Sequence, residues 1–115
     1  AASPVAIRAE AQLVPARTRT LRFADRADGA VTITDARTGT IASIVARDSD
    51  SGFIRGVMRG LMRERRLHKV GVNVPFRLAA WPDGGLSLTD TGTGRTIELG
   101  AFGATNRATF AALLP

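Results

Sequence analysis

Two stretches of the chain alternate between apolar and polar residues, and this period of two is typical of half-buried β-strands. In the first stretch Leu21 and Phe23 alternate with polar neighbours, and glycine-containing turns divide each stretch into three. The strands expected in the first stretch begin at Arg19, continue through Val31 and Ile33, and extend over 40–46. Those expected in the second stretch cover 75–81, 85–90 and 95–99. Each stretch therefore predicts a three-stranded antiparallel meander.

The two meanders are also similar in sequence. Residues 21–39, LRFADRADGAVTITDARTG, align without a gap on residues 76–94, FRLAAWPDGGLSLTDTGTG. The shared positions are mainly turn residues, such as Asp28-Gly29 and Asp83-Gly84, and most other pairs are conservative. We therefore expect one pseudo-symmetric domain over 19–115, built from a duplicated unit with copies at about 19–71 and 72–115.

A helix is expected after each meander. The first covers about 53–68, with Asp50 or Ser51 as its N-cap and Gly71 near its exit. The second is shorter and covers about 105–114. Its apolar side carries Ala108, Phe110, Ala111 and Leu114.

These elements predict an α+β fold made of two βββα units. We expect the meanders to form a sandwich or half-barrel, with the two helices covering open edges or faces. Residues 1–18 are rich in alanine, contain Pro4 and Pro15, and predict a linker. The chain starts at Ala1 without an initiator methionine, so a segment upstream of this linker is expected to be missing, and that segment could be a membrane anchor.

The longer helix sorts its side chains into stripes, because residues four apart share a helix face. Two adjacent apolar stripes predict the buried face, and they consist of Phe53, Val57 and Leu61 beside Ile54, Met58 and Met62. Gly56 and Gly60 form a small-residue stripe, and a glycine inside a helix costs about 1 kcal/mol relative to alanine. This pattern indicates the close approach of another backbone, either from the sheet of the same domain or from a partner.

Arginines form a further stripe on the far side of this helix. Arg55, Arg59 and Arg63 belong to it, and Arg65, Arg66 and Lys69 extend the positive charge. In a chain of net charge +6, such a face can bind nucleic-acid phosphates, anionic lipid headgroups or an acidic protein surface, or it can simply be solvated. Nucleic acid is unlikely, because only 5% of residues are aromatic and tyrosine is absent.

No catalytic or metal-binding constellation is visible. The chain has no cysteine, and its one histidine, His68, stands where it favours the helix C-terminus. The repeated Thr34-Asp35 and Thr89-Asp90 pairs precede turns, where aspartate commonly accepts backbone hydrogen bonds. We therefore expect no catalytic residues, no metal, no cofactor and no enzymatic activity.

Two motifs connect the chain to a known family. Gly-Phe-x-Arg-Gly-x-x-Arg-Gly-Leu over 52–61 and Ala-Phe-Gly-x-Thr-Asn over 101–106 resemble the photosynthetic complex assembly proteins of the PuhC type from purple phototrophic bacteria. The resemblance covers nearly all of 21–114. It implies an N-terminal membrane helix in the inner (intracytoplasmic) membrane, followed by a periplasmic domain. It also implies a role, without catalysis, in assembling the reaction centre with its light-harvesting 1 ring.

The leading expectation is thus a membrane-tethered assembly factor that contacts reaction-centre or light-harvesting 1 subunits close to the bilayer. The alternative is a basic binding module for anionic lipid headgroups or another acidic ligand, and an uncharacterised hydrolase is a third possibility. The candidate partner-binding residues are Arg55, Arg59, Arg63, Arg66, Gly56, Gly60, Phe102 and Asn106.

Overall fold

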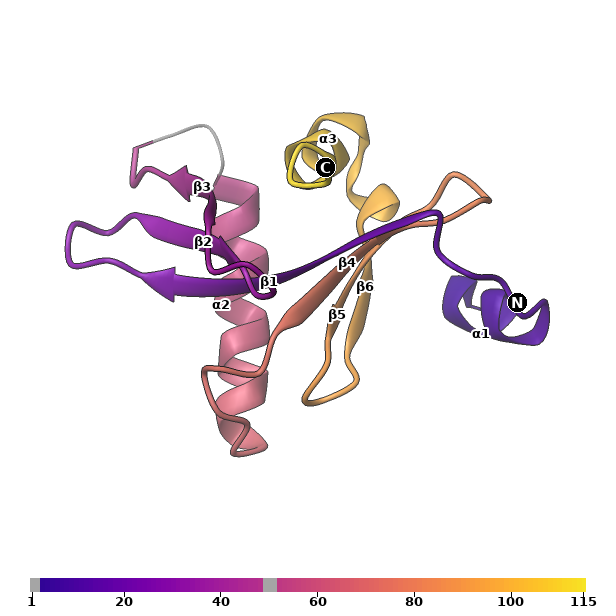
Figure 1. The fold of residues 1–115 in the computed structure, drawn as a ribbon, viewed down its shortest axis with the longest axis horizontal. Coiled ribbons are helices and arrows are strands. Elements are labelled where there is room, and N and C mark those ends of the chain that lie inside the picture. The colour runs from indigo at the N-terminus through magenta and orange to yellow at the C-terminus, as the bar shows by residue number, and fades with distance from the viewer. Residues whose placement is uncertain (1–2, 49–51) are drawn as a thin grey trace.

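The computed structural model describes residues 3–48 and 52–115 and contains one six-stranded antiparallel sheet with helices on both faces (Figure 1). The spatial order of the strands is β3-β2-β1-β4-β5-β6. The strands are β1 (Arg17–Asp25), β2 (Val31–Asp35), β3 (Ile41–Val45), β4 (Phe76–Ala80), β5 (Leu86–Asp90) and β6 (Thr96–Glu98). The helices are α1 (Pro4–Glu10), α2 (Gly52–Leu67), the short 3₁₀ helix η1 (Leu99–Phe102) and α3 (Ala104–Ala111). The α+β class, both meanders and the helix after each are confirmed.

The six strands form a single open sheet, so the sandwich alternative is wrong, whereas the half-barrel alternative stays a prediction. The long strand β1 pairs with β2 on one edge and with β4 on the other, which joins the two meanders side by side. Leu21 is opposite Asp35 in β2 and opposite Phe76 in β4. Because the meanders meet edge to edge, their apolar faces lie on one side of one sheet and do not face each other.

The two meanders have the same turn geometry and strand register. Phe23 pairs with Ile33 in the first hairpin, as Leu78 pairs with Leu88 in the second. Gly29 and Gly84 occupy equivalent turn positions with φ of 85° and 86°, a left-handed conformation that glycine adopts readily. The helices differ, since α2 has 16 residues and α3 has 8. Descent of both halves from a duplicated unit stays a prediction.

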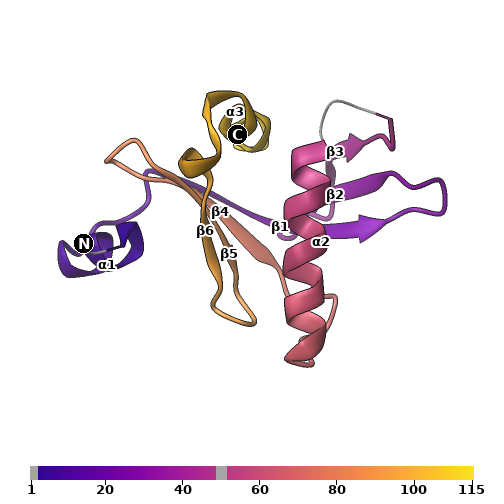
Figure 2. The ribbon, with the colours of Figure 1, turned by 180° about the vertical axis from the view of Figure 1, so that it is seen from behind.

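The core lies between one face of the sheet and the helices α2 and α3 (Figure 2). Ile54, Met58 and Leu61 are the buried apolar residues of α2, whereas Phe53, Val57 and Met62 are only partly buried. In α3 the core residue is Phe110, and Leu113 and Leu114 follow it into the core. Ala108, expected on the apolar side of α3, is exposed because the helix turns Phe110 and not Ala108 toward the sheet.

Part of the stretch 1–18, expected to be a linker, is ordered against the opposite face of the sheet. Helix α1 begins after Ser3, whose hydroxyl accepts a hydrogen bond from the Ala6 N–H, and Pro4 occupies its first turn. A serine cap followed by proline is a helix-start signal, which explains why this proline begins a helix instead of interrupting one. A membrane anchor upstream of it remains a prediction.

The expected N-cap residues of α2, Asp50 and Ser51, lie outside the described residues. None of the helices in the described part of the chain combines the length and the apolar character needed to cross a bilayer.

Candidate functional site

One flank of α2 carries a basic groove. Four arginines from successive turns of the helix line it. The other lining residues include three from β1 and one, Val31, from β2. We call this the arginine groove; its volume is about 370 Å³, and it is lined by Arg55, Arg59, Arg63, Arg66, Met58, Met62, Phe23, Ala24, Asp25 and Val31. The structure therefore brings all four predicted arginines to one surface.

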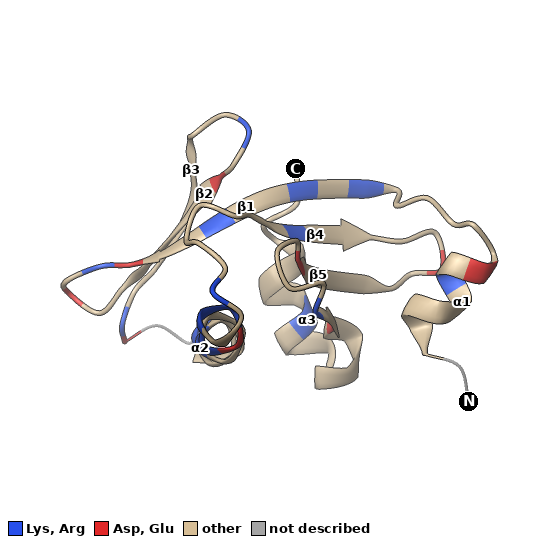
Figure 3. Cartoon of the chain, turned by 90° about the horizontal axis from the view of Figure 1, so that it is seen from below, with Lys and Arg blue, Asp and Glu red and all other residues tan. Residues whose placement is uncertain are grey.

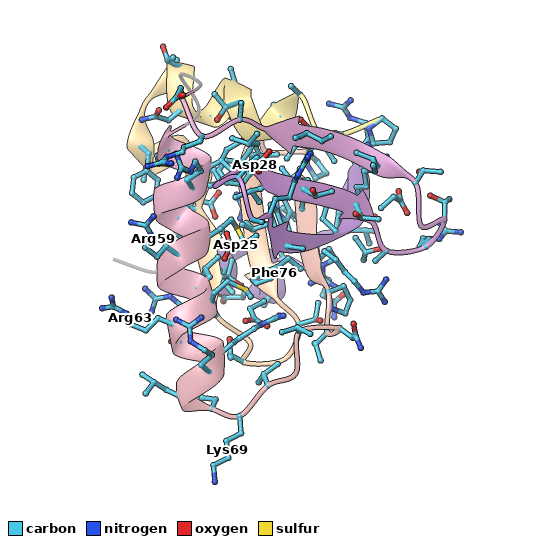
Figure 4. All side chains as sticks on the ribbon, turned by 90° about the vertical axis from the view of Figure 1, so that its left-hand side faces the viewer. Asp25, Asp28, Arg59, Arg63, Lys69 and Phe76 are labelled. Atoms are coloured by element: carbon cyan, nitrogen blue, oxygen red, sulfur yellow. The ribbon has the colours of Figure 1, made fainter. Side chains whose placement is uncertain are left out.

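Three of these arginines have no partner within the described part of the chain. Arg55 donates from Nη1 to the backbone carbonyl of Arg47. Arg59, Arg63 and Arg66 make no hydrogen bond or ion pair with any residue of 3–48 or 52–115. Arg59 and Arg63 point away from the sheet in Figure 4, and Figure 3 shows basic residues gathered on α2 and along β1. The positive charge of this flank is thus available to a ligand.

Arg65 was expected to extend that positive surface, and this prediction is wrong. Its side chain is 2% exposed and forms a buried ion pair with Asp90, with 2.8 Å between Nη2 and Oδ1. Nη1 donates to the carbonyl of Val74 at 2.7 Å, and the guanidinium lies 4.1 Å from the centre of the Phe76 ring. Arg65 lies eleven residues after Ile54, three helical turns, and therefore belongs to the buried face.

Asp90 and Asp35 occupy equivalent turn positions but have different partners. Both accept backbone N–H groups of the following turn, as predicted for turn aspartates. Burial would raise the pKa of Asp90, but hydrogen bonds from Arg65 and from the turn outweigh it and hold that pKa below its usual range. The hydrogen bond from Arg19, with those from the Thr38 and Arg37 N–H groups, lowers the pKa of Asp35 from 3.8 to about 2.

The other flank of α2 carries a second groove, which contains the predicted glycines. We call this the glycine groove; its volume is about 500 Å³, and it is lined by Gly56, Gly60, Phe53, Val57, Leu61, Glu64, Arg95, Ile97 and Phe102. A Cβ atom added at Gly56 or Gly60 would meet nothing within 4 Å. The sheet's own backbone therefore does not approach these glycines, because α2 rests on the sheet through Ile54, Met58 and Leu61 instead. The small-residue stripe faces open space.

Phe102 and Asn106 form the corner beside the glycine groove. Phe102 is 47% exposed, and its ring lies 5.3 Å from that of Phe53 across the groove. Asn106 donates from Nδ2 to the Phe102 carbonyl at 3.0 Å and so holds the corner in place. Phe102 is thus available for contact, whereas Asn106 has a supporting position.

A partly buried charge cluster on the opposite face of the sheet was not predicted. Arg8 of α1 is 5% exposed and contacts Asp83 at 2.9 Å and Glu98 at 2.6 Å, while its guanidinium lies 4.9 Å from the centre of the Trp81 ring. The hydrogen bond from Glu98, joined by that from Asp83, raises the pKa of Arg8 above its ordinary value. Asp83 was interpreted only as a turn residue, and nothing local to Arg8 indicates partners 75 and 90 residues away.

Charged side chains that gather in the described part of the chain form ion pairs. No group of three or more histidine, aspartate or glutamate side chains gathers at one point in residues 3–48 and 52–115. His68 lies at the end of α2, with Nδ1 2.9 Å from the Glu64 carbonyl one turn earlier.

The fold and its two grooves define an α+β scaffold with one helix that offers a basic flank and a small-residue flank. The chain belongs to the family of the photosynthetic complex reorganisation protein PuhC, whose family model matches residues 16–115. This match confirms the resemblance seen in the sequence, and the family's name describes reorganisation of the photosynthetic complex.

A curated relative supports the assignment. The chain is 31% identical over 84 residues to an uncharacterized 17.4 kDa protein in the puhA 5′ region of Rhodobacter capsulatus. The alignment covers 70% of this chain and 52% of the relative, so the chain spans about half the length of the curated protein that it matches. No solved structure matches the chain.

Proposed function

We propose that this protein is a non-catalytic assembly factor for the complex of the reaction centre with light-harvesting 1, and that it acts by protein–protein contact. The match of residues 16–115 to the PuhC family carries the proposal. The two grooves of α2 supply surface for such contacts. One presents three arginines that have no partner among the described residues, and the other presents glycines with open space above them.

We further propose that the domain is tethered to the inner membrane and lies on its periplasmic side. The resemblance to membrane-anchored family members supports this placement. Docking of α1 through Arg8 would then fix the direction in which the upstream chain leaves the domain.

Site-specific photo-crosslinking tests the proposal in a phototrophic host that lacks its own copy of the gene. A photoreactive residue at position 60 or 102 samples the glycine groove, and one at position 59 samples the arginine groove. We expect crosslinks to reaction-centre or light-harvesting 1 subunits from at least one groove, and a reduced level of assembled complex when the gene is absent. A photoreactive residue at position 37, on a turn away from both grooves, is the control.

Wild-type levels of assembled complex in the deletion strain would contradict the proposal. So would crosslinks that form equally from all positions, including 37, since these would show only random encounter.

A second function is favoured by one observation, the charges of Arg59, Arg63 and Arg66, which have no partner within 3–48 and 52–115. A basic module of this kind would bind anionic lipid headgroups. Cosedimentation with vesicles of phosphatidylglycerol and phosphatidylcholine separates the two functions. Salt-sensitive binding to the anionic vesicles, without crosslinks to any photosynthetic subunit, would favour the lipid-binding module.

A further inference from the structure

We propose that the arginine groove binds an extended acidic segment of a partner protein, in which acidic residues alternate with apolar ones. This inference rests on the proposed function only in taking the partner to be a protein. It specifies which of the two grooves recognises charge, and what sequence pattern that groove fits.

The spacing of the arginines sets the pattern. Arg55, Arg59 and Arg63 follow each other every four residues, and a rise of about 1.5 Å per residue places them about 6 Å apart along the axis of α2. Alternate side chains of an extended strand are about 6.6 Å apart. A strand lying along the groove therefore brings every second side chain close to one arginine. Carboxylates at those positions would form charge-assisted hydrogen bonds with successive guanidinium groups.

The two walls of the groove have opposite charge. The wall formed by α2 carries the four arginines, whereas Asp25 of β1 belongs to the sheet side. Asp25 lies beside α2 in Figure 4. A segment with carboxylates on both faces would bring one row of them toward Asp25, and like charges repel. The ligand should accordingly be acidic on one face only.

Apolar side chains form part of the groove's lining. These are Phe23, Val31, Met58 and Met62, of which Met62 is the more exposed. Methionine side chains are flexible and polarisable, so they adapt to differently shaped apolar side chains. This lining favours apolar residues at the alternate positions of the ligand and explains why the groove needs more than charge from its partner.

A single phosphate fits this arrangement less well. The distance from Arg55 to Arg66 is eleven residues, or about 16 Å along the helix axis, so the four guanidinium groups do not converge on one point. An elongated ligand with several charges uses the whole row, whereas one lipid headgroup uses a part of it. The row of charges therefore favours a peptide segment over a headgroup.

The test uses the 115-residue chain and a fluorescent synthetic peptide of about eight residues, with glutamate and valine in alternation. A control peptide has the same composition, with its glutamates and valines in two separate blocks. We expect the alternating peptide to bind with a dissociation constant about tenfold lower than that of the block peptide, as measured by fluorescence anisotropy.

Two double variants of equal charge identify the site. We expect Arg59→Gln with Arg63→Gln to weaken binding of the alternating peptide about tenfold. Arg17→Gln with Arg37→Gln removes the same charge from exposed positions outside the groove and should leave binding unchanged. Met62→Ser keeps all charges and should weaken binding of the alternating peptide more than that of the block peptide.

Each opposite result would overturn the proposal. Equal affinity for the two peptides would remove the argument from spacing, and equal losses in the two double variants would show that only net charge matters. Binding to phosphatidylglycerol vesicles without binding to either peptide would assign the groove to lipid. If the peptide fails to bind while positions 60 and 102 crosslink to photosynthetic subunits, the proposed function stands and this inference alone falls.

Discussion

The guanidinium of Arg65 and the carboxylate of Asp90 form two hydrogen bonds, of 3.1 Å and 2.8 Å, inside the core of the protein. They join the last turn of α2 to the turn between β5 and β6. Arg65 also donates to the Val74 carbonyl, in the segment that leads from α2 into β4. The side chain of Arg65 thus holds together the last turn of α2, the turn between β5 and β6, and the segment that leads into β4.

Replacement of Asp90 by alanine should strongly destabilise the protein. The substitution leaves the Arg65 charge buried without its partner, and breaking such a pair typically costs about 3–5 kcal/mol. Chemical denaturation measures this loss. Asp35→Ala is the matched control, because Asp35 accepts the same turn hydrogen bonds but pairs with the less buried Arg19. A loss in the control as large as that in Asp90→Ala would contradict the central role of the buried pair.

The free energy of unfolding should fall as the solution becomes acidic, and protonation of Asp35 is one identifiable cause of that fall. Its pKa is lower in the folded state, about 2, than its ordinary value of 3.8. The stabilisation is therefore fully present above pH 3.8 and is lost as the pH decreases toward 2. Asp83 and Asp90, whose pKa values are also lowered, act in the same direction. The melting temperatures of the wild type and of Asp35→Asn should converge as the pH is lowered from neutral to acidic. Melting temperatures that fall in parallel would argue against a contribution from Asp35.

Loss of the Arg8 side chain should release α1 while leaving the sheet folded. Trp81 is the only tryptophan of the chain, and the guanidinium of Arg8 lies over its ring. In Arg8→Ala we expect the tryptophan emission to shift to longer wavelength as water reaches the ring. Proteolysis of the N-terminal segment should also become faster. Arg17→Ala removes an exposed arginine of β1 and is the control. An unchanged emission spectrum in Arg8→Ala would show that α1 stays docked without this cluster.

Alanine at Gly56 or Gly60 should stabilise the isolated domain. The added methyl group meets no atom within 4 Å, and alanine is favoured over glycine inside a helix by about 0.5–1 kcal/mol. The same change at Gly92 should destabilise, because its Cβ would collide with Cγ1 of Val70. Thermal unfolding measures both the expected rise in melting temperature at Gly56 or Gly60 and the expected fall at Gly92. If a partner backbone occupies the glycine groove, Gly60→Ala should in addition lower the level of assembled photosynthetic complex, in spite of its higher melting temperature.

The strands and the two main helices could be predicted because their signals are local. Alternation around Leu21 and Phe23, and the glycines that close the turns, depend on residues that are close in sequence. The pairing of β1 with β4 was not predictable in this way, since it joins residues far apart in the chain. A half-barrel and a sandwich therefore remained equally compatible with the two meanders.

The candidate site was predicted in part for the same reason. Helical spacing was enough to group Arg55, Arg59 and Arg63, and the structure keeps them together with Arg66. Arg65 was wrongly assigned to the exposed surface because a charged side chain is usually solvated. Its buried partner Asp90 comes 25 residues later, so nothing near Arg65 in the sequence indicated the ion pair. Arg8 was missed because its partners come from the far end of the chain, although the Ser3-Pro4 helix start was visible.

The position of β1 between the two meanders affects the order in which the protein can fold. Leu21 and its partner Phe76 are 55 residues apart, so one edge of β1 stays unpaired until the ribosome has made β4. At about 5–20 residues per second, this interval lasts several seconds. The hairpin of β1 and β2 is local and can close at once. Closure of the β1–β4 seam must wait, because it joins the residues that are farthest apart in sequence among the strand pairings. A nascent chain therefore exposes a ready strand edge for the whole time that α2 is being synthesised, and this is the period in which it is most vulnerable to mispairing with another copy.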